Sequence, residues 1–406
     1  MKKAILFLLV ISLSLTFTGC MGQSVELKDL TVIQGIGVDK KDDELSISMQ
    51  VFDATKASGN ANELSGNLTK VLYAEGKSIY EAIYQAATHI GGDPFASQNR
   101  LIVLGEDLVK ENIKGIMDYF VRDNETRLNV TVAIAKGEAK EILESDNSDA
   151  LVPADEVVKL IRASEDDLIA PNTDVLSILK PMTETGGDFY ITAIKVKEEK
   201  EEEKQGESGS DSGQQQGKEE GKSDEKKEAK KVITDGVGVF KDDKLIGYLN
   251  EDETKGLLWI TGKVSGDILV VDEEEVGQVS AEVLEVTPKI KFSLENDIPV
   301  CTISIQCFMG VDEIQKNKEE NFTLGTMDSV EEKISKSISE NIEKTINRCI
   351  NDYDVDIFRL NDYFRNFNPT LYKQVKDDWH EYIKTIQFRT DVSTQISRVG
   401  ERVIKK

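Results

Sequence analysis

The sequence predicts an α+β protein of three domains, each a mostly antiparallel β-sheet with surrounding α-helices, together with a disordered charged loop. Segments of alternating apolar residues, typical of half-buried strands, are interspersed with segments of helical periodicity. The chain has 406 residues, which allows several domains at about 100 to 200 residues each. Residues 198–231 contain no aromatic residue and a single apolar one, Ala229. This segment has nothing to bury and is expected to be disordered.

Residues 1–19 have the pattern of a lipoprotein signal peptide. Lys2 and Lys3 precede a mostly apolar run at residues 4–17, which is too short to span a bilayer. Gly19 places a small side chain directly before Cys20, as a signal peptidase requires. We expect cleavage before Cys20, a diacylglyceryl group on its thiol and an N-acyl lipid on its new amino terminus. The alternative is an ordinary secretory signal with a cysteine nearby.

The charge of the chain excludes some partners. The formal net charge is −25, and cleavage before Cys20 would remove Lys2 and Lys3 and make the charge more negative. Anionic headgroups and nucleic acid both repel so acidic a surface. We therefore expect no nucleic-acid partner, and we expect the acyl chains on Cys20 to hold the protein at the membrane. No later run approaches the roughly 20 apolar residues that a membrane helix needs.

The N-terminal domain is expected at residues 20–145. It begins with a hairpin at residues 31–52, whose turn lies at residues 40–43. Ser78, followed three residues later by Glu81, predicts the start of a helix that ends near Gly91. Further strands are expected at residues 100–104 and 128–135, and further helices at residues 106–122 and 138–144.

The middle domain is expected at residues 146–275, with the disordered charged insertion at residues 198–231. Helices are predicted at residues 154–161 and 175–179, strands at 189–196 and 232–249 with a turn at 241–244, and a helix that starts at Asn250. We interpret the charged tract as a loop inserted between two strands of this domain, with an interdomain hinge as the alternative.

The C-terminal domain is expected at residues 276–406. Strands at residues 282–292 and 299–309 precede a long helix at residues 328–351, capped by Asp328 or Ser329, in which apolar residues recur every four positions. Such a stripe winds around the helix, so this helix should contact both the sheet and the aromatic-rich short helices that follow. A final strand at residues 386–396 completes a β-β-α-β arrangement.

The sequence predicts no catalytic, cofactor-binding or metal-binding residue, and therefore no enzyme. His89 and His380 have no partner at metal-ligand spacing. Gly35 and Gly37 lack the third glycine of a dinucleotide-binding loop. Cys301 and Cys307 lie on one predicted strand, too far apart to pair. We expect buried thiols, with a bridge from Cys349 to one of the other two as the alternative.

Several motifs occur in order along the mature chain, namely Cys20, VIQGIGVD at 32–39, LIVLGE at 101–106, GVFKDDKLIGYL at 238–249, KGLLW at 255–259, and DIF at 356–358 leading to Asn368-Pro369 and Trp379. In these motifs the sequence resembles the GerAC (Ger(x)C) family, the lipoprotein C subunits of spore nutrient germinant receptors, over nearly the whole mature chain. Two departures stand out, because the family commonly has Trp-Asp where Met21 and Gly22 follow Cys20, and Trp where this chain has Tyr372.

The resemblance implies a three-domain protein anchored by lipid to the outer face of the spore inner membrane. It further implies two integral-membrane partners, the A and B germinant receptor subunits, with which the protein would act when nutrients trigger germination. No catalytic residue is established for the family, so only the lipidated Cys20 is carried over. These inferences favour a non-catalytic interaction or assembly subunit.

Two other functions compete with that hypothesis. A solute-binding lipoprotein delivering a nutrient to a membrane transporter would have two matched lobes around a cleft, whereas the sequence shows three unlike blocks. A cell-wall hydrolase would need catalytic residues that the sequence does not display.

Overall fold

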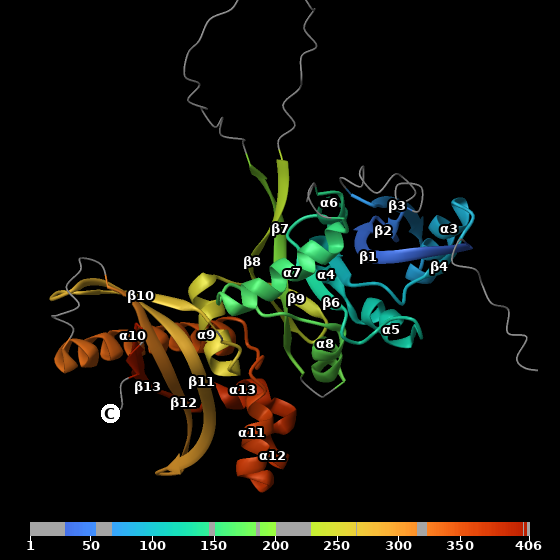
Figure 1. Ribbon diagram of the computed structural model, residues 1–406. Helices are drawn as coiled ribbons and strands as arrows, with labels where there is room; N and C mark the ends of the chain where they lie inside the picture. Colours follow the sequence, from blue (N-terminus) through green and yellow to red (C-terminus); the bar gives the residue numbers. More distant parts are fainter. Residues whose placement is uncertain are drawn as a thin grey trace, which may run out of the picture.

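The computed structural model of the protein describes residues 29–53, 67–145, 151–183, 187–199, 229–264, 266–314, 323–400 and 402–403. It confirms the α+β class and contains two β-sheets within these residues. The first sheet with helices α3 to α8 forms what we call the first lobe, and the second sheet with helices α10 to α13 forms the second lobe (Figure 1). Helix α9 connects them.

The first sheet has the strand order β3-β2-β1-β5-β6-β7-β8-β9, with β4 also pairing to β1. Parallel pairs join β1, β5, β6 and β7, and antiparallel pairs complete the two ends. The strands are β1 (Leu30–Lys41), β2 (Glu44–Phe52), β3 (Thr69–Gly76), β4 (Asp93–Phe95), β5 (Leu101–Gly105), β6 (Thr131–Ala135), β7 (Phe189–Glu199), β8 (Ala229–Lys241) and β9 (Lys244–Leu249).

Both faces of this sheet are covered by helices, which explains why its central strands are continuously apolar. On β5, Ile102 and Leu104 contribute to the core on one face, while Leu101 and Val103 contribute to the core on the other. The first core receives α3 (Ile79–His89), α4 (Glu106–Glu111), α5 (Lys114–Arg122) and α8 (Val175–Met182); the second receives α6 (Ala139–Glu144) and α7 (Pro153–Asp166).

The VIQGIGVD motif on β1 has a structural explanation. The carboxylate of Asp39 accepts hydrogen bonds from the backbone N–H groups of Ala139 (2.7 Å) and Lys140 (3.0 Å) at the start of α6. A Cβ on Gly37 would lie 2.4 Å from the Ser48 hydroxyl and 3.2 Å from the Ala139 Cβ. Strand β1 therefore approaches α6 closely because of its glycine and caps that helix with its aspartate.

The second sheet has the order β10-β11-β12-β13-β14. Its strands are β10 (Ile268–Glu273), β11 (Gly277–Glu295), β12 (Ile298–Ile314), β13 (Gln387–Val399) and β14 (Arg402–Val403). Strands β11 and β12 form an antiparallel hairpin, and β13 lies parallel to β12 after the helical crossover. The predicted β-β-α-β arrangement is thus confirmed.

The crossover contains α10 (Leu324–Ile346), which continues as the π-helical turn η3 (Asn347–Asp352). The predicted caps Asp328 and Ser329 are wrong. Thr323 caps the helix instead, because its side chain and that of Thr326 form a reciprocal capping box one turn earlier. The helix contacts the sheet as expected, through β13 and β10, but the helix packed most closely against it is the preceding α9 (Glu251–Thr261) rather than the short helices that follow. The short helices that follow are α11 (Leu360–Phe367), α12 (Pro369–Val375), η4 (Lys376–Asp378) and α13 (Trp379–Ile383).

The single helix predicted at residues 106–122 is also wrong, since α4 and α5 are separate. Asn112 has extended backbone dihedrals, and its side chain accepts a hydrogen bond from the Lys114 N–H at 2.7 Å. An asparagine that offers the backbone this alternative partner ends one helix and begins the next.

The strands expected in the first two domains belong to one continuous sheet. Strand β6 of the first segment pairs with β7 of the second, through Ala133↔Thr192 to Ala135↔Ile194. The division at residue 145 stays a prediction, and so does the division at residue 275. The charged tract runs from β7 to β8, which pair antiparallel as far as Glu199↔Ala229; residues 200–228 themselves lie outside the described residues.

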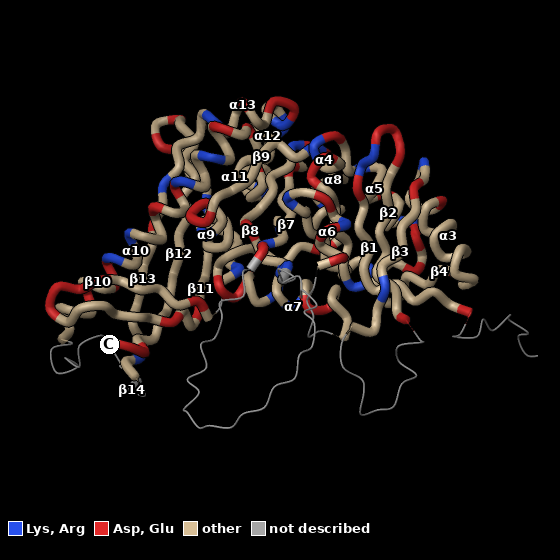
Figure 2. Tube along the Cα trace, turned by 90° about the horizontal axis from the view of Figure 1, so that it is seen from above, with Lys and Arg blue, Asp and Glu red and all other residues tan. Residues whose placement is uncertain are grey.

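Seen from above, the first lobe continues directly into the second, and acidic and basic residues are distributed over both (Figure 2). None of the helices in the described ranges has both the length and the apolar character needed to cross a membrane.

Candidate functional site: the junction between the lobes

Helix α9 joins the lobes through a shared hydrophobic core. It contacts β8 and β9 of the first sheet, β11 and β12 of the second, and α10. Trp259 is fully buried in a cluster that includes Val239 from the first sheet and Ile303 and Ile342 from the second lobe. Because one core receives side chains from both sheets, the lobes are packed as a single body.

The crossing of α9 and α10 depends on a glycine. A Cβ on Gly256 would lie 2.3 Å from the Asn341 carbonyl oxygen and 2.0 Å from the Thr345 hydroxyl. That hydroxyl donates a hydrogen bond to the Glu253 carbonyl at 2.7 Å. The KGLLW motif therefore combines a glycine at the closest approach of the two helices with the buried Trp259.

Charged side chains also cross the junction. Glu253 accepts a hydrogen bond from Arg348 at 2.8 Å while its other oxygen caps the N–H of Asn250 at 2.9 Å. Lys344 lies 2.7 Å from Asp252, and Lys241 of the first lobe pairs with Asp354 of the second. Glu253 thus links the start of α9 to the end of α10 while also completing the cap of α9.

A buried polar network also crosses the junction. Asp188, which precedes β7, accepts hydrogen bonds on its Oδ2 from the Asp356 backbone N–H (2.7 Å) and contacts His380 Nε2 (2.8 Å). The carboxylate of Asp356 in turn accepts from the N–H groups of Leu360 and Asn361 and from the Trp379 indole, each at 2.9 Å. The Asp188 carboxylate of the first lobe thereby contacts two residues of the second, Asp356 and His380.

The titration of this network follows from its contacts. The hydrogen bond to Asp188 raises the pKa of His380, although partial burial opposes that shift. Burial raises the pKa of Asp356, although its three donors oppose the shift. The Oδ1 atom of Asp188 is buried and has no hydrogen-bond partner among the described residues.

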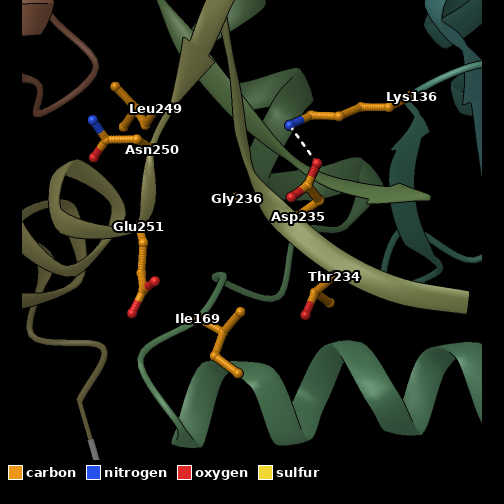
Figure 3. A pocket seen from close by; sticks show the side chains of 8 residues that line it. All are labelled: Lys136, Ile169, Thr234, Asp235, Gly236, Leu249, Asn250 and Glu251. Carbon is orange, nitrogen blue, oxygen red and sulfur yellow. Dashed lines mark hydrogen bonds and ion pairs between the residues drawn. The ribbon is translucent and has the colours of Figure 1, made fainter. Parts of the chain in front are cut away.

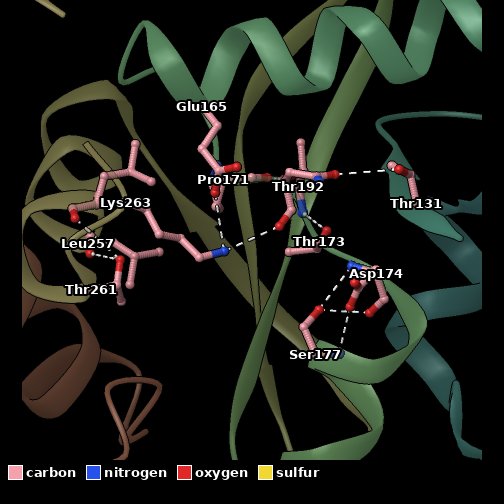
Figure 4. A network of polar contacts seen from close by, with 12 residues as sticks. Thr131, Glu165, Pro171, Thr173, Asp174, Ser177, Thr192, Leu257, Thr261 and Lys263 are labelled. Atoms are coloured by element: carbon pink, nitrogen blue, oxygen red, sulfur yellow. Dashed lines mark hydrogen bonds and ion pairs between the residues drawn. The ribbon is translucent and has the colours of Figure 1, made fainter. Parts of the chain in front are cut away.

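A cavity of about 270 Å³ adjoins this network between α8, β7, the end of α9 and residues 357–359. Lys263 stands at its edge, with its amino group 3.2 Å from Glu165 and 3.3 Å from the Asn172 carbonyl (Figure 4). The lining residues are Thr173, Ser177, Lys180, Pro181, Asp188, Phe189, Tyr190, Thr261, Lys263, Ile357, Phe358 and Arg359.

A second, more open hollow of about 490 Å³ lies beside Lys136 and Asp235 (Figure 3). Asp235 lies 2.7 Å from Lys136 and 3.1 Å from Lys195. Burial tends to raise the pKa of Asp235, but the two lysines outweigh it and the pKa is lowered. Because Asp235 already has two cationic partners, this hollow offers a ligand less unsatisfied charge than the interlobe cavity does.

The sequence identified one site residue, Cys20, and it lies outside the described residues. His89 is exposed at the end of α3, whereas His380 belongs to the interlobe network, which the sequence did not reveal. Cys301, Cys307 and Cys349 are buried free thiols, as expected, and burial raises the pKa of Cys301 and of Cys307 to about 12. No group of three His, Cys, Asp or Glu side chains within the described ranges could hold a metal.

Fold and junction together define a two-lobed α+β protein whose lobes are fixed to each other by a common core. The chain belongs to the GerAC family of spore germination proteins. Residues 23–196 match the family model described as spore germination protein N-terminal domain, and residues 235–400 match the model described as spore germination B3/GerAC like, C-terminal. Proteins of this family function in spore germination.

Known relatives resemble the chain over most of its length. It is 23% identical over 417 residues to spore germination protein B3 of Bacillus subtilis (strain 168), covering 98% of this chain and 99% of that protein. Spore germination protein KC of the same organism is 21% identical over 412 residues, covering 99% and 97%. The crystal structure of the GerBC protein has the same fold, with a TM-score of 0.55 at 20% identity, covering 89% and 96%.

Proposed function

We propose that this protein is the lipid-anchored subunit of a nutrient germinant receptor complex, on the outer face of the spore inner membrane. The observation that carries the proposal is the match to spore germination protein B3 over nearly the full length of both chains. In this proposal the lipid on Cys20 confines the folded lobes to the membrane surface, which raises their effective concentration near the integral-membrane A and B subunits.

The role we propose is one of interaction or assembly, without catalysis. The shared core around Trp259 supports it, because lobes packed as one body present partner-binding surfaces in a fixed arrangement. The same feature disfavours a solute-binding lipoprotein, whose two matched lobes would close around a ligand. Here the sheets differ, one of nine and one of five strands among the described residues.

An affinity purification tests the complex. The tagged protein is recovered from detergent-solubilised spore membranes, and co-purifying proteins are identified by mass spectrometry. We expect two multi-spanning membrane proteins. Recovery of neither, from membranes in which other complexes remain intact, would contradict the proposal.

The anchor needs its own experiment. Metabolic labelling with a radioactive fatty acid should mark the wild-type protein and leave Cys20→Ala unlabelled, and the Cys20→Ala variant should lose much of the nutrient-triggered germination. Met21→Ala is the matched control and should retain both. Full germination with an unlipidated protein would argue against a positional role for the anchor.

A further inference from the structure

We propose that the cavity between the lobes is a binding site for a small organic carboxylate with an apolar body. The cavity has a volume of about 270 Å³ and is walled by both lobes, with α8 and β7 on one side and residues 357–359 on the other. Concave sites between domains, mostly apolar with a few polar groups, are typical of small-molecule binding. This inference is independent of the receptor-subunit proposal.

The charge of the lining indicates the sign of the ligand. Lys180, Lys263 and Arg359 all line the cavity in a protein whose formal net charge is −25. Glu165, which pairs with Lys263, and Asp362, which pairs with Arg359, do not line the cavity.

Lys180 strengthens that charge balance, whereas Asp188 reduces it. Lys180 is exposed on the last turn of α8 and has no ion-pair partner among the described residues. Asp188 is the acidic residue of the lining, and His380 lies against it. Cations therefore outnumber carboxylates where a ligand would sit, which favours an anion.

The remaining lining indicates the shape of the ligand. Phe189, Phe358, Ile357 and Pro181 supply apolar surface. Thr173, Ser177, Tyr190 and Thr261 also line the cavity, and the hydroxyls of Thr173, Ser177 and Thr261 donate to backbone carbonyls of the protein itself. An inorganic anion would leave the apolar surface uncovered, whereas a carboxylate carrying a ring or a branched chain would fill it.

The backbone at Arg359 is a second, independent observation. This residue has φ 61° and ψ 38°, a left-handed conformation that costs an arginine more than a glycine. Unfavourable backbone conformations that the surrounding structure holds in place cluster at ligand sites. Arg359 adopts this conformation beside the cavity, where its guanidinium donates a hydrogen bond to the Asp362 carboxylate.

Calorimetric titration of the purified full-length protein in detergent tests the site with three matched probes. These are benzoate, the neutral benzamide and the cationic benzylamine, each also titrated into protein-free detergent. We expect saturable binding of benzoate that weakens as salt is raised, and no saturable binding of the other two. Absence of saturable benzoate binding, or tighter binding of benzylamine, would overturn the proposal.

Two variants locate the binding. Lys180→Ala removes an exposed lysine, and Arg359→Gly removes the guanidinium while relieving the left-handed backbone, so both should fold. Each should weaken benzoate binding by about tenfold or more. Lys373→Ala is the matched control, since Lys373 is also an exposed lysine in the last turn of a helix, and it should bind as the wild type does. Unchanged affinity in both cavity variants would place the binding elsewhere and refute the assignment.

Discussion

The Nε2 atom of His380 lies 2.8 Å from the Oδ2 atom of Asp188, although 192 positions separate the two residues in the chain. Asp188 immediately precedes the first sheet's strand β7, and His380 is on α13 of the second lobe. This contact connects the two lobes, and its protonation should affect how firmly they are held.

We predict that His380→Gln reduces stability more at acidic than at alkaline pH. The folded protein raises the pKa of His380 above its usual 6.5, so protonated His380 stabilises the fold. That contribution is complete below the unfolded pKa and is lost as pH rises through the folded pKa. Denaturant unfolding of wild type and variant should therefore show a difference that shrinks as pH rises from about 5 to about 9. His89→Gln is the control, and a difference that does not change with pH for His380→Gln would contradict the prediction.

Gly256→Ala should destabilise the junction. The added Cβ would meet the Asn341 carbonyl at 2.3 Å, and forcing apart two packed helices costs about 1–3 kcal/mol. Equilibrium unfolding measures the loss. Gly115→Ala in α5 is the matched control, since its Cβ would meet no atom within 4 Å, and it should be neutral or stabilising by up to about 1 kcal/mol. Equal effects of the two substitutions would show that the crossing does not require glycine.

Asp39→Ala should cost about 0.5–2 kcal/mol of unfolding free energy, because α6 would lose the acceptor of two N–H groups at its start. Asp39→Asn keeps one acceptor oxygen and should lose less. Asp43→Ala, in the exposed turn after β1, is expected to be close to neutral. If Asp43→Ala lowered the free energy of unfolding as much as Asp39→Ala does, the capping role of Asp39 would be refuted.

The thiols should resist alkylation until the protein unfolds. Burial raises the pKa of Cys301 and of Cys307 to about 12 and also raises that of Cys349. Near neutral pH the three thiols are therefore protonated, and the reagent cannot reach them in the folded protein. Mass spectrometry after iodoacetamide treatment should show these three residues unmodified in the native protein and modified in denaturant. Rapid labelling of the native protein would contradict the burial.

Elements with strong local signals could be predicted from sequence. The hairpins of β1 with β2 and of β8 with β9 were predicted from charged turns between alternating strands, and Asn250 with Glu253 forms the expected capping box of α9. The α10 cap was missed because several residues near the helix start can cap, and the reciprocal capping box with Thr326 selects Thr323. Local signals identify elements more reliably than their ends.

The arrangement of the strands could not be predicted in the same way. The parallel pairing of β1, β5, β6 and β7 joins segments far apart in the chain, and no short-range pattern specifies it. Gly256 is different, because a glycine inside a helical pattern is a signal of close packing. The Asp188 and His380 contact leaves no such signal, since neither residue stands out among its sequence neighbours.

The core around Trp259 also couples the two lobes thermodynamically. Because side chains from both sheets lie in one cluster, neither lobe can expose its share of that surface without exposing the other's. Free energy supplied by binding at one lobe is then shared by the whole molecule through linkage. A membrane protein that binds the first lobe would thereby protect the second lobe from proteolysis without contacting it.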